Sequence, residues 1–123
     1  MSARLVIADD SPTILMLVEL ALKKDGYEPV TATNGNEALE AIREHRPELV
    51  IVDAMMPGLS GYDVCRALRA DVDAPRPHVM MLSAGAREVD KTLAAEVGID
   101  EFITKPFSPA VLRERVREIL GDP

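Results

Sequence analysis

The chain has 123 residues, of which 47% are hydrophobic and 28% charged, a composition typical of one soluble globular domain with its own core. Acidic residues outnumber basic ones by 21 to 14, and the net charge of −7 argues against a nucleic-acid-binding surface. No apolar run approaches the roughly 18 residues needed to cross a bilayer. The first apolar run begins almost directly after Met1, which leaves no room for a signal peptide. We therefore expect a cytoplasmic protein.

Short apolar runs alternate with helical patterns along the chain, which is typical of buried parallel strands. Four runs end in residues that phosphate chemistry can use: Leu5 to Ala8 precedes Asp9 and Asp10, Leu49 to Val52 precedes Asp53, Val79 to Leu82 precedes Ser83, and Phe102 to Thr104 precedes Lys105. The carboxyl ends of parallel strands lie at one edge of the sheet, where open α/β folds bind ligands. We expect three carboxylates, a hydroxyl and an ammonium to meet there. That set suits a magnesium ion and a phosphoryl group.

Capping signals mark the helices between these strands. Ser11-Pro12 and Ser108-Pro109 are typical helix starts, and the pairs Asn34/Glu37 and Ser60/Asp63 have the offset of a capping box. A fourth helix is expected from about Glu88 to Val97, and the polar strand near Val30 to Thr33 is expected at a sheet edge. Right-handed crossovers then place helices on both faces of a doubly wound α/β sheet. Cys65, the only cysteine, is expected to fill the core.

The chain resembles the receiver domain of two-component response regulators. The resemblance rests on Asp9-Asp10, on Asp53 followed by Ala54-Met55-Met56-Pro57-Gly58, on Ser83-Ala84 and on Lys105-Pro106-Phe107. It covers essentially the whole sequence, so we expect one receiver domain over residues 1–123. It implies a flavodoxin-like fold of five parallel strands in the order 2-1-3-4-5. It also implies a signalling domain that accepts a phosphoryl group from a histidine kinase or a histidine phosphotransfer protein and changes conformation to control an unknown output.

The acidic residues have physical roles in such a site. Neighbouring carboxylates repel one another, and a hard divalent cation relieves the repulsion. By resemblance, Mg²⁺ is held by Asp10, Asp53 and the main-chain carbonyl of Met55, with Asp9 acting through water. Asp53 is the expected nucleophile, because a carboxylate can accept a phosphoryl group as an acyl phosphate.

Four further residues complete the expected site. Lys105 and the metal would neutralise the transferring group, and Ser83 would donate a hydrogen bond to a phosphoryl oxygen. The resemblance implies that the peptide bond before Pro106 is cis, which aims Lys105 inward. It also implies that Ser83 and Phe102 form a switch that couples the site to the face made by the fourth helix, fifth strand and fifth helix.

Two partner surfaces are expected. On the first helix, a period of about 3.6 residues turns Met16 outward with Leu15 and Leu20 on its flanks, and this apolar cluster is expected to dock the kinase. A phosphorylation-dependent homodimer would use the fourth helix, fifth strand and fifth helix. Complementary charges there are carried by Lys91, Asp100, Glu101 and Arg115, while Val111 replaces an acid usual in regulators that pair this way.

Two other functions use similar residues. A phosphatase of the haloacid dehalogenase type also combines aspartate with Mg²⁺, but places its nucleophile after the first strand in an Asp-x-Asp arrangement, whereas Asp9 and Asp10 are adjacent. A flavodoxin-like nucleotide-binding module needs a Ser-, Thr- or Gly-rich loop there, and an acidic pair would repel phosphate. We therefore expect a domain that catalyses only its own phosphorylation and dephosphorylation and is not an enzyme with a separate substrate.

Overall fold

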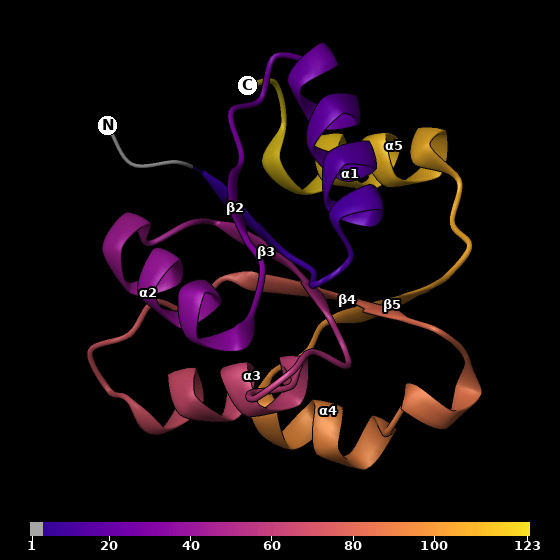
Figure 1. The fold of residues 1–123 in the computed structure, drawn as a ribbon. Coiled ribbons are helices and arrows are strands. Elements are labelled where there is room, and N and C mark those ends of the chain that lie inside the picture. The colour runs from indigo at the N-terminus through magenta and orange to yellow at the C-terminus, as the bar shows by residue number, and fades with distance from the viewer. Residues whose placement is uncertain (1–3) are drawn as a thin grey trace.

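The computed structural model describes residues 4–123, in which five strands alternate with five α-helices (Figure 1). The strands are β1 (Leu5–Ala8), β2 (Val30–Ala32), β3 (Leu49–Asp53), β4 (His78–Ser83) and β5 (Glu101–Thr104). The helices are α1 (Pro12–Lys24), α2 (Gly35–His45), α3 (Gly61–Ala70), α4 (Lys91–Val97) and α5 (Pro109–Leu120), and a 3₁₀ turn, η1 (Ala86–Glu88), precedes α4. Among these helices, none combines the length and the apolar character that a bilayer crossing requires.

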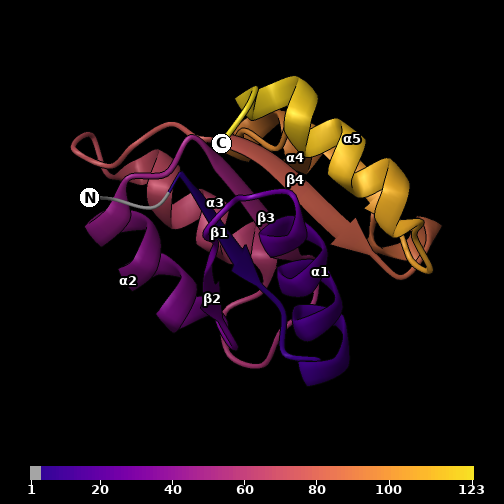
Figure 2. The same cartoon turned by 90° about the horizontal axis from the view of Figure 1, so that it is seen from above.

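The strands form one parallel sheet in the order β2-β1-β3-β4-β5, which confirms the expected topology. Helices α1 and α5 cover one face of the sheet, and α2, α3 and α4 cover the other (Figures 1 and 2). The most polar strand, β2, lies at an edge as predicted, and β5 lies at the opposite edge. All carboxyl ends of the strands therefore point to the same edge.

Two apolar cores lie on the two faces of the sheet. Because side chains alternate along a strand, Leu5 and Ile7 pack under α1 and α5, whereas Val6 and Ala8 pack under α2, α3 and α4. Cys65 belongs to the second core, where burial raises the pKa of its thiol to about 12. It fills the core as expected.

The expected capping residues all begin helices. Each accepts a hydrogen bond from the backbone three residues further on: Ser11 from Ile14, Asn34 from Glu37, Ser60 from Asp63 and Ser108 from Val111. The reciprocal bond of a capping box is present at Ser60 and Asp63. At α2 the Glu37 carboxylate instead accepts from the amide and the hydroxyl of Thr33, both at 2.9 Å. The capping box predicted at Asn34 and Glu37 therefore has only one of its two hydrogen bonds.

The fourth helix begins later than the sequence suggested. Residues 86–88 form η1, and Asp90 caps α4 by accepting a hydrogen bond from the amide of Leu93 at 2.9 Å. The expected start at Glu88 is wrong, because Gly85 adopts φ +157° and turns the chain before the helix can form. Glu88 is therefore the last residue of η1, outside α4.

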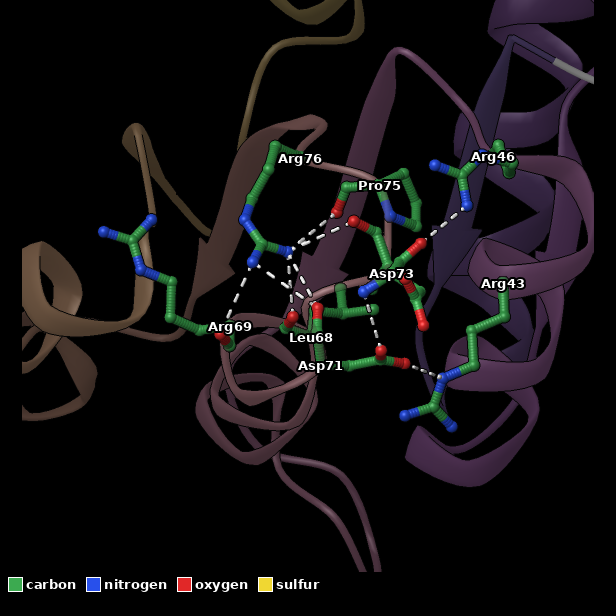
Figure 3. Close-up of polar contacts among 9 residues, drawn as sticks. Arg43, Arg46, Leu68, Arg69, Asp71, Asp73, Pro75 and Arg76 are labelled. Carbon is green, nitrogen blue, oxygen red and sulfur yellow. Dashed lines mark hydrogen bonds and ion pairs between the residues drawn. The ribbon is translucent and has the colours of Figure 1, made fainter.

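An arginine from the following loop caps the C-terminus of α3 (Figure 3). The guanidinium of Arg76 donates a hydrogen bond to the carbonyl of Leu68 at 2.9 Å and lies close to neighbouring carbonyls. A cation at this position complements the unpaired carbonyls at a helix C-terminus. Arg43 of α2 pairs with Asp71 at 3.5 Å, which joins the same loop to the neighbouring helix. This end of the domain is opposite the edge to which the strands point.

Candidate functional site

Three carboxylates meet at the carboxyl edge of the sheet, as the sequence predicts. Asp9 and Asp10 directly follow β1, and Asp53 is the last residue of β3. Each offers an oxygen within 4.8 Å of the oxygens of the other two. Asp9 and Asp53 are buried, whereas Asp10 is exposed. A hard divalent cation would find oxygen ligands here and an open side for water.

Lys105 reaches this cluster from the end of β5. Its ammonium lies 2.6 Å from Asp53 Oδ1 and 3.5 Å from Asp9 Oδ2, and the Lys105–Pro106 peptide bond is cis. Burial lowers the pKa of Lys105, but the carboxylates of Asp53 and Asp9 outweigh this effect and raise it. Lys105 is therefore a charged group that faces the acidic cluster.

Three buried oxygens at this edge lack a hydrogen-bond partner among residues 4–123: Asp9 Oδ2, Asp53 Oδ1 and Ser83 Oγ. The contact between Lys105 and Asp53 is an ion pair by distance but lacks the direction of a hydrogen bond. Both carboxylate oxygens still face the Lys105 ammonium, so the cost of about 1–3 kcal/mol for an unsatisfied buried polar group applies to Ser83 Oγ. A cation on the carboxylates and an anionic oxygen on the Ser83 hydroxyl would satisfy all three atoms. The site therefore fits Mg²⁺ together with a phosphoryl group.

Burial also affects the protonation of the two enclosed carboxyls. It raises the pKa of both Asp9 and Asp53 above the ordinary value. The amide of Ser11, which donates to Asp9 Oδ1 at 2.9 Å, and the Lys105 ammonium oppose this effect without cancelling it. Two ionised carboxylates in this setting are poorly solvated, and a divalent cation would stabilise their charged forms.

The loop from Ala54 to Ser60 is held by two glycines without space for a side chain. A Cβ atom on Gly61 would lie 2.4 Å from the carbonyl oxygen of Asp53, and one on Gly35 would lie 2.5 Å from that of Leu59. The amide of Gly61 also donates to the carbonyl of Ala54 at 2.9 Å. These contacts fix the backbone next to Asp53. Met55, the expected carbonyl ligand, lies in this loop with an exposed side chain.

The region around the expected switch contains two residues that the sequence analysis missed. Phe102 is partly buried, and its ring centroid lies 6.5 Å from that of Tyr62. The Tyr62 hydroxyl donates to the carbonyl of Glu88 and accepts from the amide of Asp90 at 2.9 Å. The Glu88 carboxylate in turn accepts from the amide of Ala84 at 2.7 Å. Neither Tyr62 nor Glu88 ends a strand, so strand-end positions could not reveal them.

The three expected docking residues lie on the outer surface of α1 or on its flank. Met16 and Leu20 are 60% and 59% exposed on α1, as predicted. Leu15, expected on a flank, is partly buried against the core that α1 and α5 share. Leu17, at 42% exposure, joins Met16 and Leu20 on the outer surface.

Some charged residues of the expected dimer face already form ion pairs with residues of the same chain. Arg115 pairs with Glu101 at 2.8 Å and with Glu118 at 3.3 Å. Val111, where an acid was expected from the resemblance, is 59% exposed. A dimer through this face would have to share or exchange the Arg115 pair, and it stays a prediction.

A doubly wound sheet with an acidic cluster, a hydroxyl and a lysine at its carboxyl edge defines the class of phospho-accepting signalling domains. The family model of the response regulator receiver domain matches residues 5–117, and the chain belongs to this family. The match favours a receiver domain over the haloacid dehalogenase and flavodoxin-like alternatives. It also places the chain in a signalling family.

Relatives and solved structures agree with this family. Over 117 residues the chain is 41% identical to the DNA-binding response regulator MtrA of Mycolicibacterium smegmatis, covering 95% of this chain and 50% of that protein. It is also 41% identical to the probable transcriptional regulator ycf27 of Pyropia yezoensis, covering 95% and 47%. The chain therefore spans about half the length of these curated relatives.

Among solved structures, the chemotaxis response regulator CheY4 of Vibrio cholerae is similar with a TM-score of 0.85 and 29% identity, covering 98% of this chain and 100% of that one. The receiver domain of a signal transduction histidine kinase from Syntrophus aciditrophicus has a TM-score of 0.82 and 34% identity, covering 97% and 90%. The chain is thus a receiver domain of the CheY-like fold.

Proposed function

We propose that this receiver domain accepts a phosphoryl group on Asp53 from a histidine kinase or a histidine phosphotransfer protein. The observation that carries the proposal is the position of the Asp53 carboxylate. It is buried at the end of β3, 2.6 Å from the Lys105 ammonium, and shares its surroundings with two other carboxylates. A carboxylate so placed is a nucleophile with the charges around it that phosphoryl transfer needs.

The transfer exchanges one bond for another. An oxygen of the Asp53 carboxylate attacks the phosphorus, an O–P bond forms, and the N–P bond of the donor phosphohistidine breaks with its electron pair returning to the imidazole nitrogen. Lys105 neutralises negative charge on the transferred group, and the Ser83 hydroxyl, which is buried without a partner among residues 4–123, donates to one of its oxygens. Positioning and charge compensation supply most of the catalysis in such a step.

The acidic cluster would hold the metal. Asp10 and Asp53 would bind Mg²⁺ directly together with the main-chain carbonyl of Met55, and Asp9 would act through water. When bound, the ion supplies further charge neutralisation for the phosphoryl oxygens. Since these groups all belong to the domain, the domain catalyses its own phosphorylation and dephosphorylation and acts on no separate substrate.

The exposed apolar residues of α1 are the proposed kinase-docking surface. Met16, Leu17 and Leu20 are large, apolar and exposed on one helix, and α1 begins directly after the acidic pair. Exposed apolar clusters of this kind mark interaction surfaces. A partner bound here could bring a phosphohistidine to the carboxyl edge of the sheet.

We propose that the response controlled by this receiver is carried out by another protein or by another domain. MtrA is named as DNA-binding, but this chain matches about half of it and carries a net charge of −7. We therefore propose that the receiver itself does not bind nucleic acid. A cytoplasmic location and a phosphorylation-dependent homodimer through α4, β5 and α5 complete the proposal.

The proposal is tested by chemical phosphorylation. Incubation with acetyl phosphate and Mg²⁺ is expected to add one acid-stable, base-labile phosphoryl group per chain, and Asp53→Asn is expected to remove the labelling. Asp73→Asn, in the exposed loop after α3, is the matched control and is expected to label like the wild type. Undiminished labelling of Asp53→Asn would show that the acceptor is another residue.

A further inference from the structure

Glu88 folds back onto the backbone amide that follows the switch serine. The amide of Ala84, the first residue after β4, donates to Glu88 Oε1 at 2.7 Å, directly beside Ser83. Two features bring Glu88 back: Gly85 adopts φ +157°, a conformation that favours glycine, and its carbonyl accepts a hydrogen bond from the Glu88 amide at 3.1 Å. We name the contact between Ala84 and the Glu88 carboxylate the Glu88 clasp.

The clasp places an anion where the phosphorylated site needs donors. Within residues 4–123, the Glu88 carboxylate accepts the Ala84 hydrogen bond and forms no ion pair with a lysine or an arginine. Next to it, the Ser83 hydroxyl is buried and lacks a hydrogen-bond partner in the described part of the chain. A phosphoryl group on Asp53 carries nearly two negative charges, and it would accept hydrogen bonds from N–H and O–H donors at the end of β4. Two anions cannot share these donors without repulsion.

The same glutamate is bonded to the aromatic part of the switch. Its main-chain carbonyl accepts the hydrogen bond of the Tyr62 hydroxyl, which also accepts from the amide of Asp90. The Tyr62 ring lies against Phe102, with a centroid separation of 6.5 Å. A continuous series of contacts therefore leads from the Ala84 amide through Glu88 and Tyr62 to Phe102. Movement of Glu88 would therefore change the contacts of both the segment before α4 and Phe102.

We infer that Glu88 is an internal competitor of the phosphoryl group: its carboxylate holds the Ala84 amide in the unphosphorylated domain, and a phosphoryl group on Asp53 displaces it. The inference rests on the proposed function and deepens it by assigning a positioning residue to the switch. Repulsion from the phosphoryl group drives the Glu88 carboxylate away, and the freed Ala84 amide donates to a phosphoryl oxygen. Release of Glu88 then loosens its bond to Tyr62 and frees the loop before α4.

The competition has a reciprocal consequence that can be measured. If binding of a phosphoryl mimic breaks the clasp, then a variant without the clasp binds the mimic more tightly by the same coupling factor. The experiment is a titration of ¹⁵N-labelled protein with beryllium fluoride in the presence of Mg²⁺, followed by NMR. Glu88→Gln removes the charge, Glu88→Ala also removes the acceptor, and Glu96→Gln on the exposed surface of α4 is the charge-matched control.

We expect the two Glu88 variants to bind beryllium fluoride about fivefold more tightly than the wild type or better, the lower range of ordinary coupling, and Glu96→Gln to stay within about twofold. Without ligand, the Ala84 amide is expected to exchange its hydrogen faster in Glu88→Ala than in the wild type. Equal affinity of the wild type and both Glu88 variants would overturn the clasp inference alone. Failure of all four proteins to bind beryllium fluoride would overturn the proposed function, and the inference with it.

Discussion

The ammonium of Lys105 lies 2.6 Å from Asp53 Oδ1, so the residue after β5 and the residue that ends β3 form an ion pair at the carboxyl edge of the sheet. This one cation faces three carboxylates, two of them buried. The cluster therefore keeps an excess of negative charge. The excess is unfavourable for stability and favourable for binding a divalent cation.

Asp53→Asn is expected to stabilise the fold by about 1 kcal/mol at neutral pH, because it removes a poorly solvated charge. Burial raises the folded-state pKa of Asp53 above its unfolded value, so the native protein holds more protons between the two values. Wild-type stability therefore falls as pH rises through that window. The advantage of the variant is full above the raised pKa and disappears below the unfolded value. Urea unfolding of both proteins across this range checks the prediction, and a variant less stable than wild type at pH 7 would contradict it.

Asp10→Asn is expected to weaken Mg²⁺ binding roughly tenfold, because the exposed carboxylate supplies one of the charges that attract the ion. Calorimetric titration of the variant and of Asp73→Asn, which makes the same charge change in a distant exposed loop, measures the effect. Unchanged affinity in Asp10→Asn would mean that the ion binds elsewhere.

Lys105→Gln is expected to keep Mg²⁺ binding and to lose phosphorylation. The substitution removes a cation from the metal cluster, so affinity for Mg²⁺ should hold or increase. Labelling by acetyl phosphate should slow roughly a hundredfold, the usual cost of removing one preorganised charge-stabilising donor. Lys91→Gln on α4 is the control. Normal labelling rates in Lys105→Gln would remove Lys105 from the transfer step.

Replacing Met16 and Leu20 together by arginine is expected to slow phosphotransfer from the cognate kinase by roughly tenfold, because their apolar surface no longer fits the partner. Labelling by acetyl phosphate should be unaffected. Val72→Arg provides a matched control, since Val72 is 88% exposed in the loop after α3. Equal losses with the kinase and with acetyl phosphate would point to damage of the fold.

Cys65 is expected to resist alkylation in the native protein. Burial raises the pKa of its thiol to about 12, so almost no reactive thiolate is present at pH 8. Modification by iodoacetamide should follow the population of unfolded protein and increase steeply through the urea transition. Rapid alkylation without denaturant would show that α3 opens locally.

The sheet and most of the site were predictable because strong local signals agree with one another. Four apolar runs are short enough to be strands, and each is followed directly by a polar residue: Asp9, Asp53, Ser83 or Lys105. The topology of a parallel sheet is enough to bring these four side chains to one edge. Serine and asparagine caps are similarly local, because the bond each forms spans three residues.

Features that depend on packing between elements were not predictable. How deeply Leu15 is buried depends on α5, which packs beside α1, and no period within α1 reveals that contact. The start of α4 depends on how Gly85 turns the chain and on a carboxylate that bonds to a backbone amide. Tyr62 reaches Glu88 from a helix 26 residues earlier in the sequence. The glycine at position 85 was the one local sign of a turn that could bring Glu88 back.

The two close glycine contacts beside Asp53 make one side of the site tightly packed. Gly61 and Gly35 lie so near the loop after β3 that neither position has room for a side chain. Across the site, the segment after Ser83 is held by hydrogen bonds that a competing anion could replace. If Asp53 accepts a phosphoryl group as proposed, we expect the resulting rearrangement on the side of Ala84 and α4 and not on the side of the two glycines.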